Sequence, residues 1–285
     1  MRLCRFDDDR LGLVEGDTVL DVSEALAELP PQRWPLSPGD PLIAHLSTVR
    51  AAVERTASNA AAKPLSAVSL KSPVANPTKI IGAPVNYAKH VAESKADPQI
   101  APGQEIKGIA DYGPFLKANS SLVGPGEGVA LRFTDRRNDH EGELAVVIGR
   151  SGTNIPLEDA DDYIAGYALS LDMTVRGNED RSARKSIDSY SVVGPWLVTK
   201  DEIADPNALD LTLTVNGEPR QASNTRHLIY DVQKLISWCS TFYTLHPGDI
   251  IMTGTPEGVG PVVDGDVMEL EIEQVGRMTV NVRAA

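Results

Sequence analysis

One short segment constrains the fold of this 285-residue chain more than any other, namely residues 143–149, ELAVVIG. Five consecutive apolar residues follow its glutamate. Runs of this length and content are typical of a β-strand that is buried on both faces. Such a strand needs a large core around it. A chain of 285 residues can supply one large core, alone or with a small satellite domain.

The later part of the chain contains further strand patterns. Residues 211–215 (LTLTV) alternate in polarity and are followed by Asn216-Gly217, a strong hairpin signal, and residues 267–273 (VMELEIE) alternate again. Apolar residues at helical spacing predict a helix at 226–243, and a shorter helix is expected at 157–164. We therefore expect a β-rich, mixed α+β body with few helices.

The first part of the chain has a different character. Residues 1–22 are expected to form short strands, and Asp40-Pro41 is expected to open a helix, with the aspartate as its cap and the proline in its first turn. Residues 60–77 are rich in alanine, serine and proline and are interpreted as a linker. These patterns divide the chain into a small N-terminal α+β domain, 1–70, and a larger domain, 71–285.

Charge and composition disfavour several classes of protein. The net charge of −13 argues against nucleic acid as a partner, because an acidic surface repels phosphate backbones. No apolar stretch of the signal-peptide kind opens the chain, and the apolar runs are too short to span a bilayer, so no membrane association is expected. Cys4 and Cys239, the two cysteines, offer neither a disulfide framework nor zinc-site spacing. A cytoplasmic location is the simplest interpretation.

Acidic residues lie at the start of the buried strand. Within a strand, Glu141 and Glu143 point to the same face, because side chains alternate with period two. They repel each other unless they share a cation, and carboxylate oxygens suit Mg²⁺, Mn²⁺ or Ca²⁺. Asp172, at the end of another mostly apolar segment, would complete an all-carboxylate site. The alternative is a solvated strand end with Asp172 in a turn, which is the more common arrangement for the Glu-x-Glu pattern alone.

A histidine and a glutamate form a second candidate group. His90 and Glu93 are three residues apart and can touch on a helical turn. A carboxylate beside an imidazole orients the ring and raises its basicity, which suits a general base acting on water. The preceding Ile80-Ile81-Gly82 is expected to be a strand end, where active-site loops often begin. The alternative is a His–Glu pair on the surface.

Basic residues and a glycine-rich loop supply further candidates. Arg176 and Lys185 follow Asp172 and could hold an anionic substrate or stabilise an enolate, although Arg181 and Arg184 nearby weaken a choice made from spacing. Ordinary surface charge is the alternative. The loop 253–260 (TGTPEGVG) lacks the lysine and spacing of a P-loop. It could offer hydroxyl and N–H groups to a carboxylate, but a tight turn between strands is the more common explanation.

Seven segments, in order, resemble the fumarylacetoacetate hydrolase family from about Lys79 to the C-terminus. They are IIGAPVNYAKHVAE, GPFLKANSSLVGPGEGV, DHEGELAVVIGR, GYALSLDMTVR, RKSIDSYSVVGPWLV, LTVNGEPRQ and GDIIMTGTPEGVG. Each segment is weak evidence alone, but seven in one order are specific. The resemblance implies the family's β-roll catalytic domain, usually in a homodimer, preceded by a variable N-terminal domain.

The same resemblance implies a metal site and a catalytic dyad. Glu141, Glu143 and Asp172 match the family's metal ligands, normally for Mg²⁺ or Mn²⁺. His90 and Glu93 match the dyad that activates water in the acylpyruvase branch.

Further residues are implied to contact the substrate. Lys185 matches a lysine that contacts the substrate and is expected to be catalytic, Arg176 matches the arginine after the metal-binding aspartate, and Thr255 matches a threonine that contacts a substrate carboxylate. Tyr87 is also expected to bind substrate. Many members have glutamine where this chain has Glu179, so the ligand here is expected to differ in charge or size.

The function that the resemblance implies is metal-dependent hydrolysis of a C–C bond in a 1,3-diketo acid. The substrate would be an acylpyruvate, fumarylpyruvate or maleylpyruvate, and the products would be pyruvate and a carboxylic acid. Decarboxylation, or isomerisation or hydration, of a related 2-oxo acid through an enolate is an alternative. A non-catalytic metal-binding protein of the same fold is another. The polar stretch Ser94–Asp111 is expected to form a lid over the site.

Overall fold

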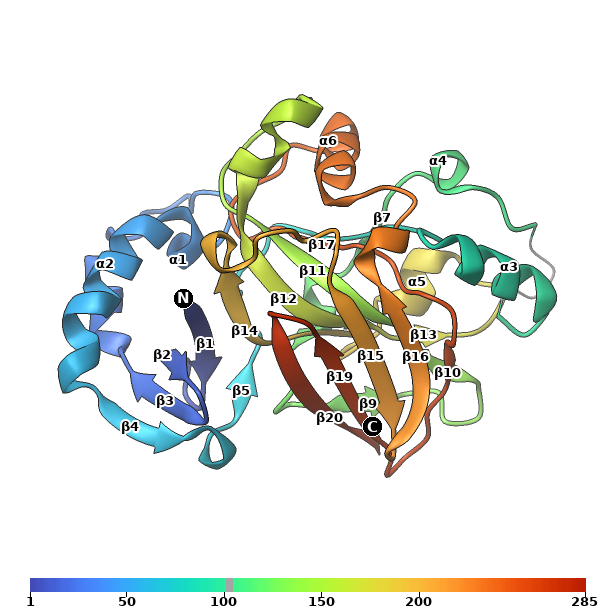
Figure 1. The fold of residues 1–285 in the computed structure, drawn as a ribbon, viewed down its shortest axis with the longest axis horizontal. Helices are drawn as coiled ribbons and strands as arrows, with labels where there is room; N and C mark the ends of the chain where they lie inside the picture. Colours follow the sequence, from blue (N-terminus) through green and yellow to red (C-terminus); the bar gives the residue numbers. More distant parts are fainter. Residues whose placement is uncertain (101–104) are drawn as a thin grey trace.

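The structure is a computed structural model that describes residues 1–100 and 105–285. Within these residues, twelve strands form one large sheet with the path β4-β3-β2-β1-β14-β12-β11-β17-β6-β7, while β5 pairs with β1 and β8 with β14 (Figure 1). The strands are β1 (Arg2–Phe6), β2 (Arg10–Glu15), β3 (Thr18–Asp21), β4 (Ala61–Pro64), β5 (Leu70–Lys71), β6 (Ile80–Gly82), β7 (Phe115–Lys117), β8 (Leu122–Val123), β11 (Gly142–Ile148), β12 (Ile164–Asp172), β14 (Ser191–Thr199) and β17 (Ile250–Met252).

Two smaller sheets complete the β-structure of the described residues. A five-stranded sheet has the order β16-β15-β19-β20-β9, and a three-stranded sheet has the order β13-β10-β18. Their strands are β9 (Val129–Leu131), β10 (Asn138–His140), β13 (Thr174–Val175), β15 (Asp210–Val215), β16 (Glu218–Asn224), β18 (Gly260–Pro261), β19 (Val267–Ile272) and β20 (Gly276–Ala284). Figure 1 shows the five-stranded sheet in front of the large one.

The helices are short and lie around the sheets. The α-helices are α1 (Pro41–Ala44), α2 (Leu46–Thr56), α3 (Ala88–Ala96), α4 (Ile109–Tyr112), α5 (Arg181–Lys185) and α6 (Val232–Phe242). The 3₁₀ helices are η1 (Ser23–Glu28), η2 (Ala57–Asn59), η3 (Leu65–Ala67), η4 (Asn119–Ser121), η5 (Leu157–Tyr163), η6 (Lys200–Glu202) and η7 (Thr225–His227). Of the helices that the structure describes, none has the length and apolar character needed to cross a bilayer.

The centre of the large sheet confirms the predicted strand that is buried on both faces. Every residue of β11 is buried, and so is every residue of its antiparallel neighbour β12. Their register pairs Gly142 with Leu171, and the Asp172 backbone N–H donates to the Glu141 carbonyl at 2.9 Å. This pairing places the end of β12 beside the start of β11, so that the predicted carboxylates become neighbours.

The five-stranded sheet packs over the start of β11. A Cβ atom added to Gly142 would lie 3.0 Å from Leu270 Cδ1 and 3.1 Å from Leu213 Cδ1, so glycine permits the close approach of the two layers. The predicted hairpin is also confirmed, because Asn216 and Gly217 both have positive φ (53° and 79°) between β15 and β16.

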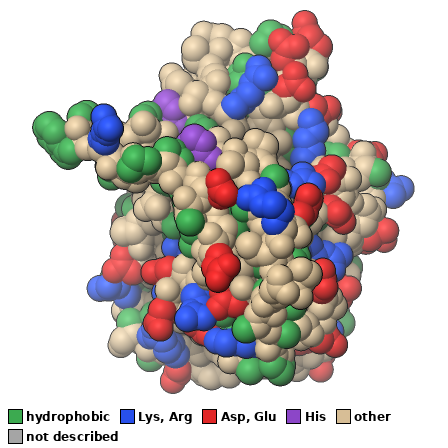
Figure 2. All heavy atoms as spheres, turned by 90° about the vertical axis from the view of Figure 1, so that its left-hand side faces the viewer, with side chains coloured by type: hydrophobic (Ala, Val, Ile, Leu, Met, Phe, Trp, Pro, Cys, Tyr) green, Lys and Arg blue, Asp and Glu red, His purple; other side chains and the backbone are tan. Residues whose placement is uncertain are grey.

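The N-terminal residues extend the large sheet through the pairing of β1 with β14. A separate group of buried apolar side chains, including Leu3, Val22, Val49 and Val53, lies where α2 packs near β1–β3. Asp40 caps the predicted helix by accepting from the Leu42 and Ile43 N–H groups, although the helix is divided into α1 and α2. Figure 2 shows this side of the molecule, where acidic and basic side chains are interspersed.

Three predicted elements differ from the structure. The linker interpretation of 60–77 is wrong for residues 61–64 and 70–71, because β4 pairs with β3 and β5 pairs with β1. The ladder hydrogen bonds come from distant partners, which local composition does not signal. The helix predicted at 226–243 begins only at Val232, where Asp231 provides the cap, and the helix predicted at 157–164 is the 3₁₀ helix η5.

Candidate active site

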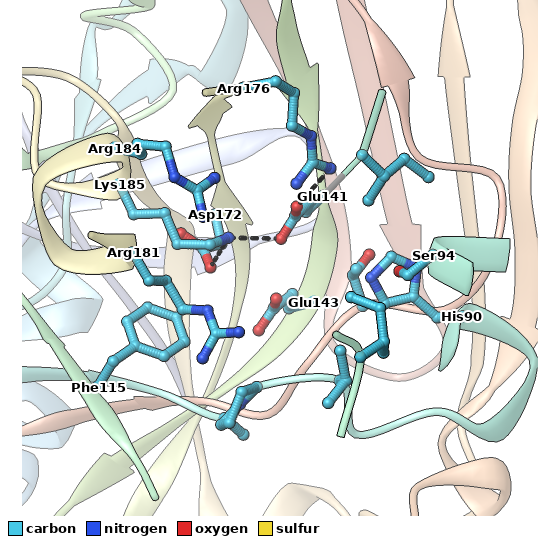
Figure 3. Close-up of a pocket in the computed structure, with 16 residues that line it drawn as sticks. His90, Ser94, Phe115, Glu141, Glu143, Asp172, Arg176, Arg181, Arg184 and Lys185 are labelled. Atoms are coloured by element: carbon cyan, nitrogen blue, oxygen red, sulfur yellow. Dashed lines mark hydrogen bonds and ion pairs between the residues drawn. The ribbon is translucent and has the colours of Figure 1, made fainter. Parts of the chain in front are cut away.

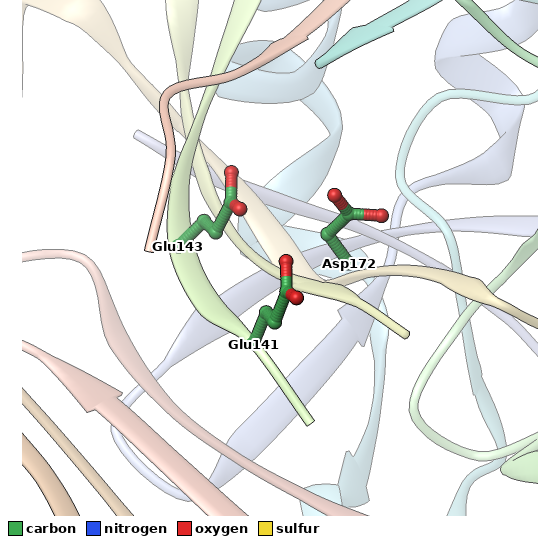
Figure 4. A group of neighbouring side chains, drawn as sticks. All are labelled: Glu141, Glu143 and Asp172. Atoms are coloured by element: carbon green, nitrogen blue, oxygen red, sulfur yellow. The ribbon is translucent and has the colours of Figure 1, made fainter. Parts of the chain in front are cut away.

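Three buried carboxylates meet at the junction of β11 and β12. Glu141 directly precedes β11, Glu143 lies on it, and Asp172 ends β12. One oxygen of each carboxylate lies within 4.8 Å of the others, and the side chains converge as Figure 4 shows. Because these residues are no more than 5% exposed, water cannot screen the repulsion between them.

Lysine side chains offset part of this negative charge. The Lys185 ammonium donates to Glu141 Oε2 at 2.7 Å, to Asp172 Oδ2 at 2.6 Å and to the Thr174 hydroxyl at 2.7 Å. Lys117 contacts the other oxygen of Asp172 and donates to the Tyr190 carbonyl at 2.8 Å. Burial lowers the pKa of Lys117, although the charge of Asp172 opposes this effect.

The carboxylates of Glu141 and Glu143 have opposite electrostatic surroundings. Burial alone would raise the pKa of Glu141, but Lys185 and Arg176 outweigh it and lower that pKa. Burial, reinforced by the charges of Asp172 and Glu141, raises the pKa of Glu143 well above its ordinary value of 4.5. The Gly254 N–H, which donates to Glu143 Oε2 at 2.7 Å, opposes this rise only weakly.

The carboxylate group fits a divalent metal ion. Its donors are all carboxylate oxygens, which hard divalent cations prefer. Burial, together with the charges of Asp172 and Glu141, raises the pKa of Glu143, and a bound cation would oppose this rise by offsetting those charges. Glu141, Glu143 and Asp172 are therefore the residues that could hold such an ion.

Arg176 is anchored by acidic residues. Its Nε donates to Asp139 Oδ2 at 2.8 Å, and a terminal nitrogen donates to Glu141 Oε1 at 3.0 Å. Asp139 also accepts from Arg137 Nε at 2.7 Å. Arg176 lines the pocket, but two carboxylates already balance much of its charge.

His90 and Glu93 form the contact that their spacing predicted. Both lie on α3, which follows β6, and His90 Nδ1 is 2.9 Å from Glu93 Oε2. The other oxygen of Glu93 accepts from the Gly258 N–H at 2.8 Å, which fixes the carboxylate. Because Nδ1 faces Glu93, Nε2 is the nitrogen that remains available on the pocket side.

The glycine-rich loop 253–260 supports both groups rather than only turning between strands. Its Gly254 and Gly258 N–H groups bind Glu143 and Glu93. The Thr255 hydroxyl lines the pocket, donates to the Gly142 carbonyl at 3.0 Å and accepts from Gln221 at 2.8 Å. The loop thus links the three carboxylates to the His90–Glu93 pair.

One pocket, drawn in Figure 3, is lined by the three carboxylates, by His90 and by Thr255. The side chains of α5 lie on one side of the carboxylates, and His90 and Ser94 lie on the other. Phe115 and Ile100 add apolar surface to the wall. The pocket therefore combines a dense charged centre with a partly apolar lining.

Two arginines of α5 also line this pocket, Arg181 and Arg184. Arg181 lies over the rings of Tyr112 and Phe115, with its guanidinium carbon 4.4 Å and 5.5 Å from the ring centroids. Burial, followed by the charge of Arg176, lowers the pKa of Arg184. Spacing alone does not distinguish these two residues from the rest of the basic cluster.

Two expected substrate contacts lie away from the pocket lining. Glu179 is half exposed at its side chain and forms a bidentate ion pair with Arg136, at 2.9 Å and 2.8 Å. Tyr87 is buried, and burial raises the pKa of its hydroxyl. The expected lid, Ser94–Asp111, begins in α3 and ends in α4, and its residues 101–104 lie outside the described part of the chain.

Lys117 is a site residue that sequence reasoning missed. It is 3% exposed at the end of β7 and contacts Asp172, which lies 55 positions later in the chain. The apolar neighbours of Lys117 in Phe115-Leu116-Lys117 indicate that the lysine is buried, and a buried lysine requires an anionic partner. That signal did not reveal which carboxylate the lysine would meet.

Comparison with known proteins places the chain in a family. The family described as fumarylacetoacetate (FAA) hydrolase C-terminal matches residues 79–283, which is most of the chain. The chain belongs to the fumarylacetoacetate hydrolase family. Its mixed, sheet-rich fold is the family's fold, as the sequence segments predicted.

Members of this family with related sequences include hydrolases and a tautomerase. Maleylpyruvate hydrolase of Aquipseudomonas alcaligenes is 55% identical over 286 residues, covering 100% of both chains. A crystal structure of maleylpyruvate hydrolase from Sphingobium sp. SYK-6, in complex with manganese(II) and pyruvate, has 43% identity and a TM-score of 0.84, with 100% of both chains covered. A mitochondrial oxaloacetate tautomerase of Rattus norvegicus is 39% identical over 225 residues, covering 75% of this chain and 69% of the relative.

Metal binding is expected to release a proton from Glu143. The pKa of Glu143 is raised above 4.5, and at a pH below this raised pKa the carboxyl holds a proton that a cation must displace. The affinity for Mn²⁺ is therefore expected to rise as the pH rises from 4.5 through the raised pKa. Calorimetric titration of the metal-free protein with Mn²⁺, in two buffers of different ionisation enthalpy, measures the proton release.

The variant Glu143→Gln is expected to lose this proton release and to bind Mn²⁺ at least about tenfold more weakly. Glu269→Gln is the matched control, because Glu269 pairs with Arg277 within the five-stranded sheet and does not line the pocket. Wild-type affinity and proton release in Glu143→Gln would show that this carboxylate is not a ligand.

Proposed function

We propose that this protein is a metal-dependent hydrolase that cleaves the C–C bond of an acylpyruvate, with maleylpyruvate as its first candidate substrate. The observation that supports this most strongly is that one pocket is lined by three convergent carboxylates and by a histidine oriented by a glutamate. The 55% identity to a maleylpyruvate hydrolase over the full chain supports the choice of substrate.

Glu141, Glu143 and Asp172 are the proposed metal ligands. When bound, a divalent cation would act as a Lewis acid toward the 2-oxo acid end of the substrate. Mn²⁺ is the first choice, since a related hydrolase structure contains it, and Mg²⁺ has the same preference for oxygen ligands. The resident ion is a proposal that metal analysis of the purified protein tests.

His90 is the proposed general base. Glu93 holds the ring through Nδ1, and the Gly258 N–H holds Glu93, so Nε2 is presented in a fixed direction. Nε2 takes a proton from water as the water oxygen bonds to the acyl carbonyl carbon. Glu93, whose side chain is partly exposed, stabilises the imidazolium that results through the same contact.

The C–C bond next to the acyl carbonyl then breaks. Its electron pair passes to the carbon of the pyruvate unit as an enolate, and the acyl carbon leaves as a carboxylic acid. The enolate takes back one proton to give pyruvate, so the net change is the addition of one water molecule. Lys185 and Arg176 lie beside Glu141 and are positioned to stabilise negative charge that develops on the pyruvate unit.

Further residues are proposed to act on the substrate around this centre. Thr255 is proposed to contact the substrate through its hydroxyl in the pocket wall. Tyr87, which does not line the pocket, is proposed to act from its buried position beside α3. Glu179 is proposed to act indirectly, since its backbone carbonyl accepts from Arg184 Nε at 2.9 Å. Of the expected lid, Ser94–Asp111, the described residues 94–100 and 105–111 are proposed to cover the substrate, because Ser94, Ile100 and Ile106 line the pocket.

We also propose the organisation and location of the protein. Residues 1–70 are proposed to be a small domain and residues 71–285 the catalytic domain, which agrees with the separate apolar group near α2. A homodimer is expected from the family. Both cysteines are free and buried, which agrees with a cytoplasmic location.

The direct test of the proposed function is an ultraviolet assay of diketone loss. The purified protein with Mn²⁺ is expected to cleave maleylpyruvate and release one pyruvate per substrate, and EDTA is expected to stop the reaction. Fumarylpyruvate, acetylpyruvate and oxaloacetate complete the panel. Enol–keto conversion of oxaloacetate without cleavage of any acylpyruvate would replace hydrolysis by tautomerisation, the reaction named for the rat relative.

His90→Ala is expected to lower kcat by about 10²-fold or more, because general-base catalysis contributes that much. Mn²⁺ binding is expected to persist, because His90 is not one of the proposed metal ligands. His227→Ala is the matched control, because His227 is exposed and lies outside the pocket lining. A wild-type kcat in His90→Ala would remove the histidine from the mechanism.

A further inference from the structure

The pocket contains two positive charges that the proposed reaction does not use. Arg176 and Lys185 are paired with Asp139, Glu141 and Asp172 at 2.6–3.0 Å. Arg181 and Arg184, which line the same pocket, have no such carboxylate partner among residues 1–100 and 105–285. The two arginines are therefore the cations of the pocket whose charge remains available to a ligand.

Arg181 is held in place by aromatic rings instead of an acid. Its guanidinium carbon is 4.4 Å from the centroid of Tyr112 and 5.5 Å from that of Phe115. Contacts with ring faces fix the plane of a guanidinium group while leaving its N–H edges available. Figure 3 shows that the Arg181 side chain extends from α5 toward the centre of the pocket.

Arg184 is preorganised in a different way. The residue is only 6% exposed, and among the described residues the one hydrogen bond of its side chain runs from Nε to the Glu179 carbonyl at 2.9 Å. That bond leaves the terminal nitrogens for another acceptor. The Glu179 carboxylate is paired with Arg136 and forms no ion pair with Arg184.

Arg184 is buried and Arg181 is partly buried, and a buried arginine without a carboxylate ion-pair partner is costly unless an anion completes it. Planar guanidinium groups bind carboxylates through paired hydrogen bonds. The pyruvate unit brings one carboxylate, and the proposed function places this end of the substrate at the cation that Glu141, Glu143 and Asp172 would hold. A second carboxylate would need its own partners.

We propose that Arg181 and Arg184 bind a second carboxylate, carried on the acyl group, and thereby select acylpyruvates with a dicarboxylic acyl unit. This proposal rests on the proposed function for the orientation of the substrate. It assigns α5 the selection of the acyl group, whereas His90, on the opposite side of the carboxylates, acts on the acyl carbonyl. Preference for a charged acyl group then follows from two residues that take no part in the bond cleavage.

The test compares substrates that differ in the terminal carboxylate. The ratio of kcat/KM for maleylpyruvate to that for acetylpyruvate is measured for wild type, Arg181→Ala and Arg184→Ala, all loaded with Mn²⁺. Each variant is expected to lower this ratio at least about tenfold, mainly through KM for maleylpyruvate, because hydrogen bonds to a charged group contribute about that much. Arg181→Lys is expected to restore part of the ratio, since it keeps the charge but not the planar fork.

A control and a second measurement separate binding from structural damage. Arg132→Ala removes an exposed arginine that pairs with Asp188 outside the pocket, and its ratio is expected to equal that of wild type. Damage to the fold would lower kcat/KM for both substrates equally and leave the ratio unchanged. An unchanged ratio in both Arg181→Ala and Arg184→Ala would overturn the proposal.

Binding of the product-like dicarboxylate maleate distinguishes this proposal from the proposed function. Calorimetry of the Mn²⁺-loaded protein in saturating pyruvate is expected to show maleate binding that Arg181→Ala and Arg184→Ala weaken at least about tenfold. If wild type cleaves no acylpyruvate, hydrolysis is wrong, but loss of maleate binding in the variants still supports the arginine site. Equal maleate binding in wild type and both variants would overturn the arginine site even if hydrolysis is observed.

Discussion

Mutual repulsion of three buried carboxylates is the constraint on which the site depends. Glu141, Glu143 and Asp172 are almost inaccessible to water, and one oxygen of each lies within 4.8 Å of the others. Lys185 and Lys117 offset part of this charge, yet the pKa of Glu143 remains raised. A divalent cation held by the three carboxylates would relieve the remaining repulsion, so the cost in stability would correspond to a gain in metal affinity.

Strand pairing in the large sheet holds the three carboxylates together against their mutual repulsion. Antiparallel pairing of β11 with β12 brings Asp172 to the start of the neighbouring strand, and both strands are completely buried. The loop after β17 then donates the Gly254 N–H to Glu143 and the Gly258 N–H to Glu93. One loop therefore sets the distance between the proposed metal site and the proposed base.

The sequence predicts those parts of the molecule that depend on local pattern. The buried strand of β11, the Asn216-Gly217 hairpin and the His90–Glu93 contact follow from residues close together in the chain. Features that depend on distant partners were missed: β4 and β5 form by pairing with the N-terminal strands, and Lys117 meets an aspartate 55 residues away. Similarly, spacing gave no means of separating pocket-lining arginines from surface ones, because α5 has only five residues.

Anomalous X-ray diffraction at the manganese absorption edge, from crystals of the protein grown with Mn²⁺, tests the central claim most directly. The account predicts one strong anomalous peak bounded by the carboxylates of Glu141, Glu143 and Asp172, with all three contributing oxygens at a distance of about 2.0–2.6 Å, as for hard divalent cations. An anomalous map with no peak there, while Lys185 still bridges Glu141 and Asp172, would contradict it. The lysine would then be the permanent partner of the carboxylates.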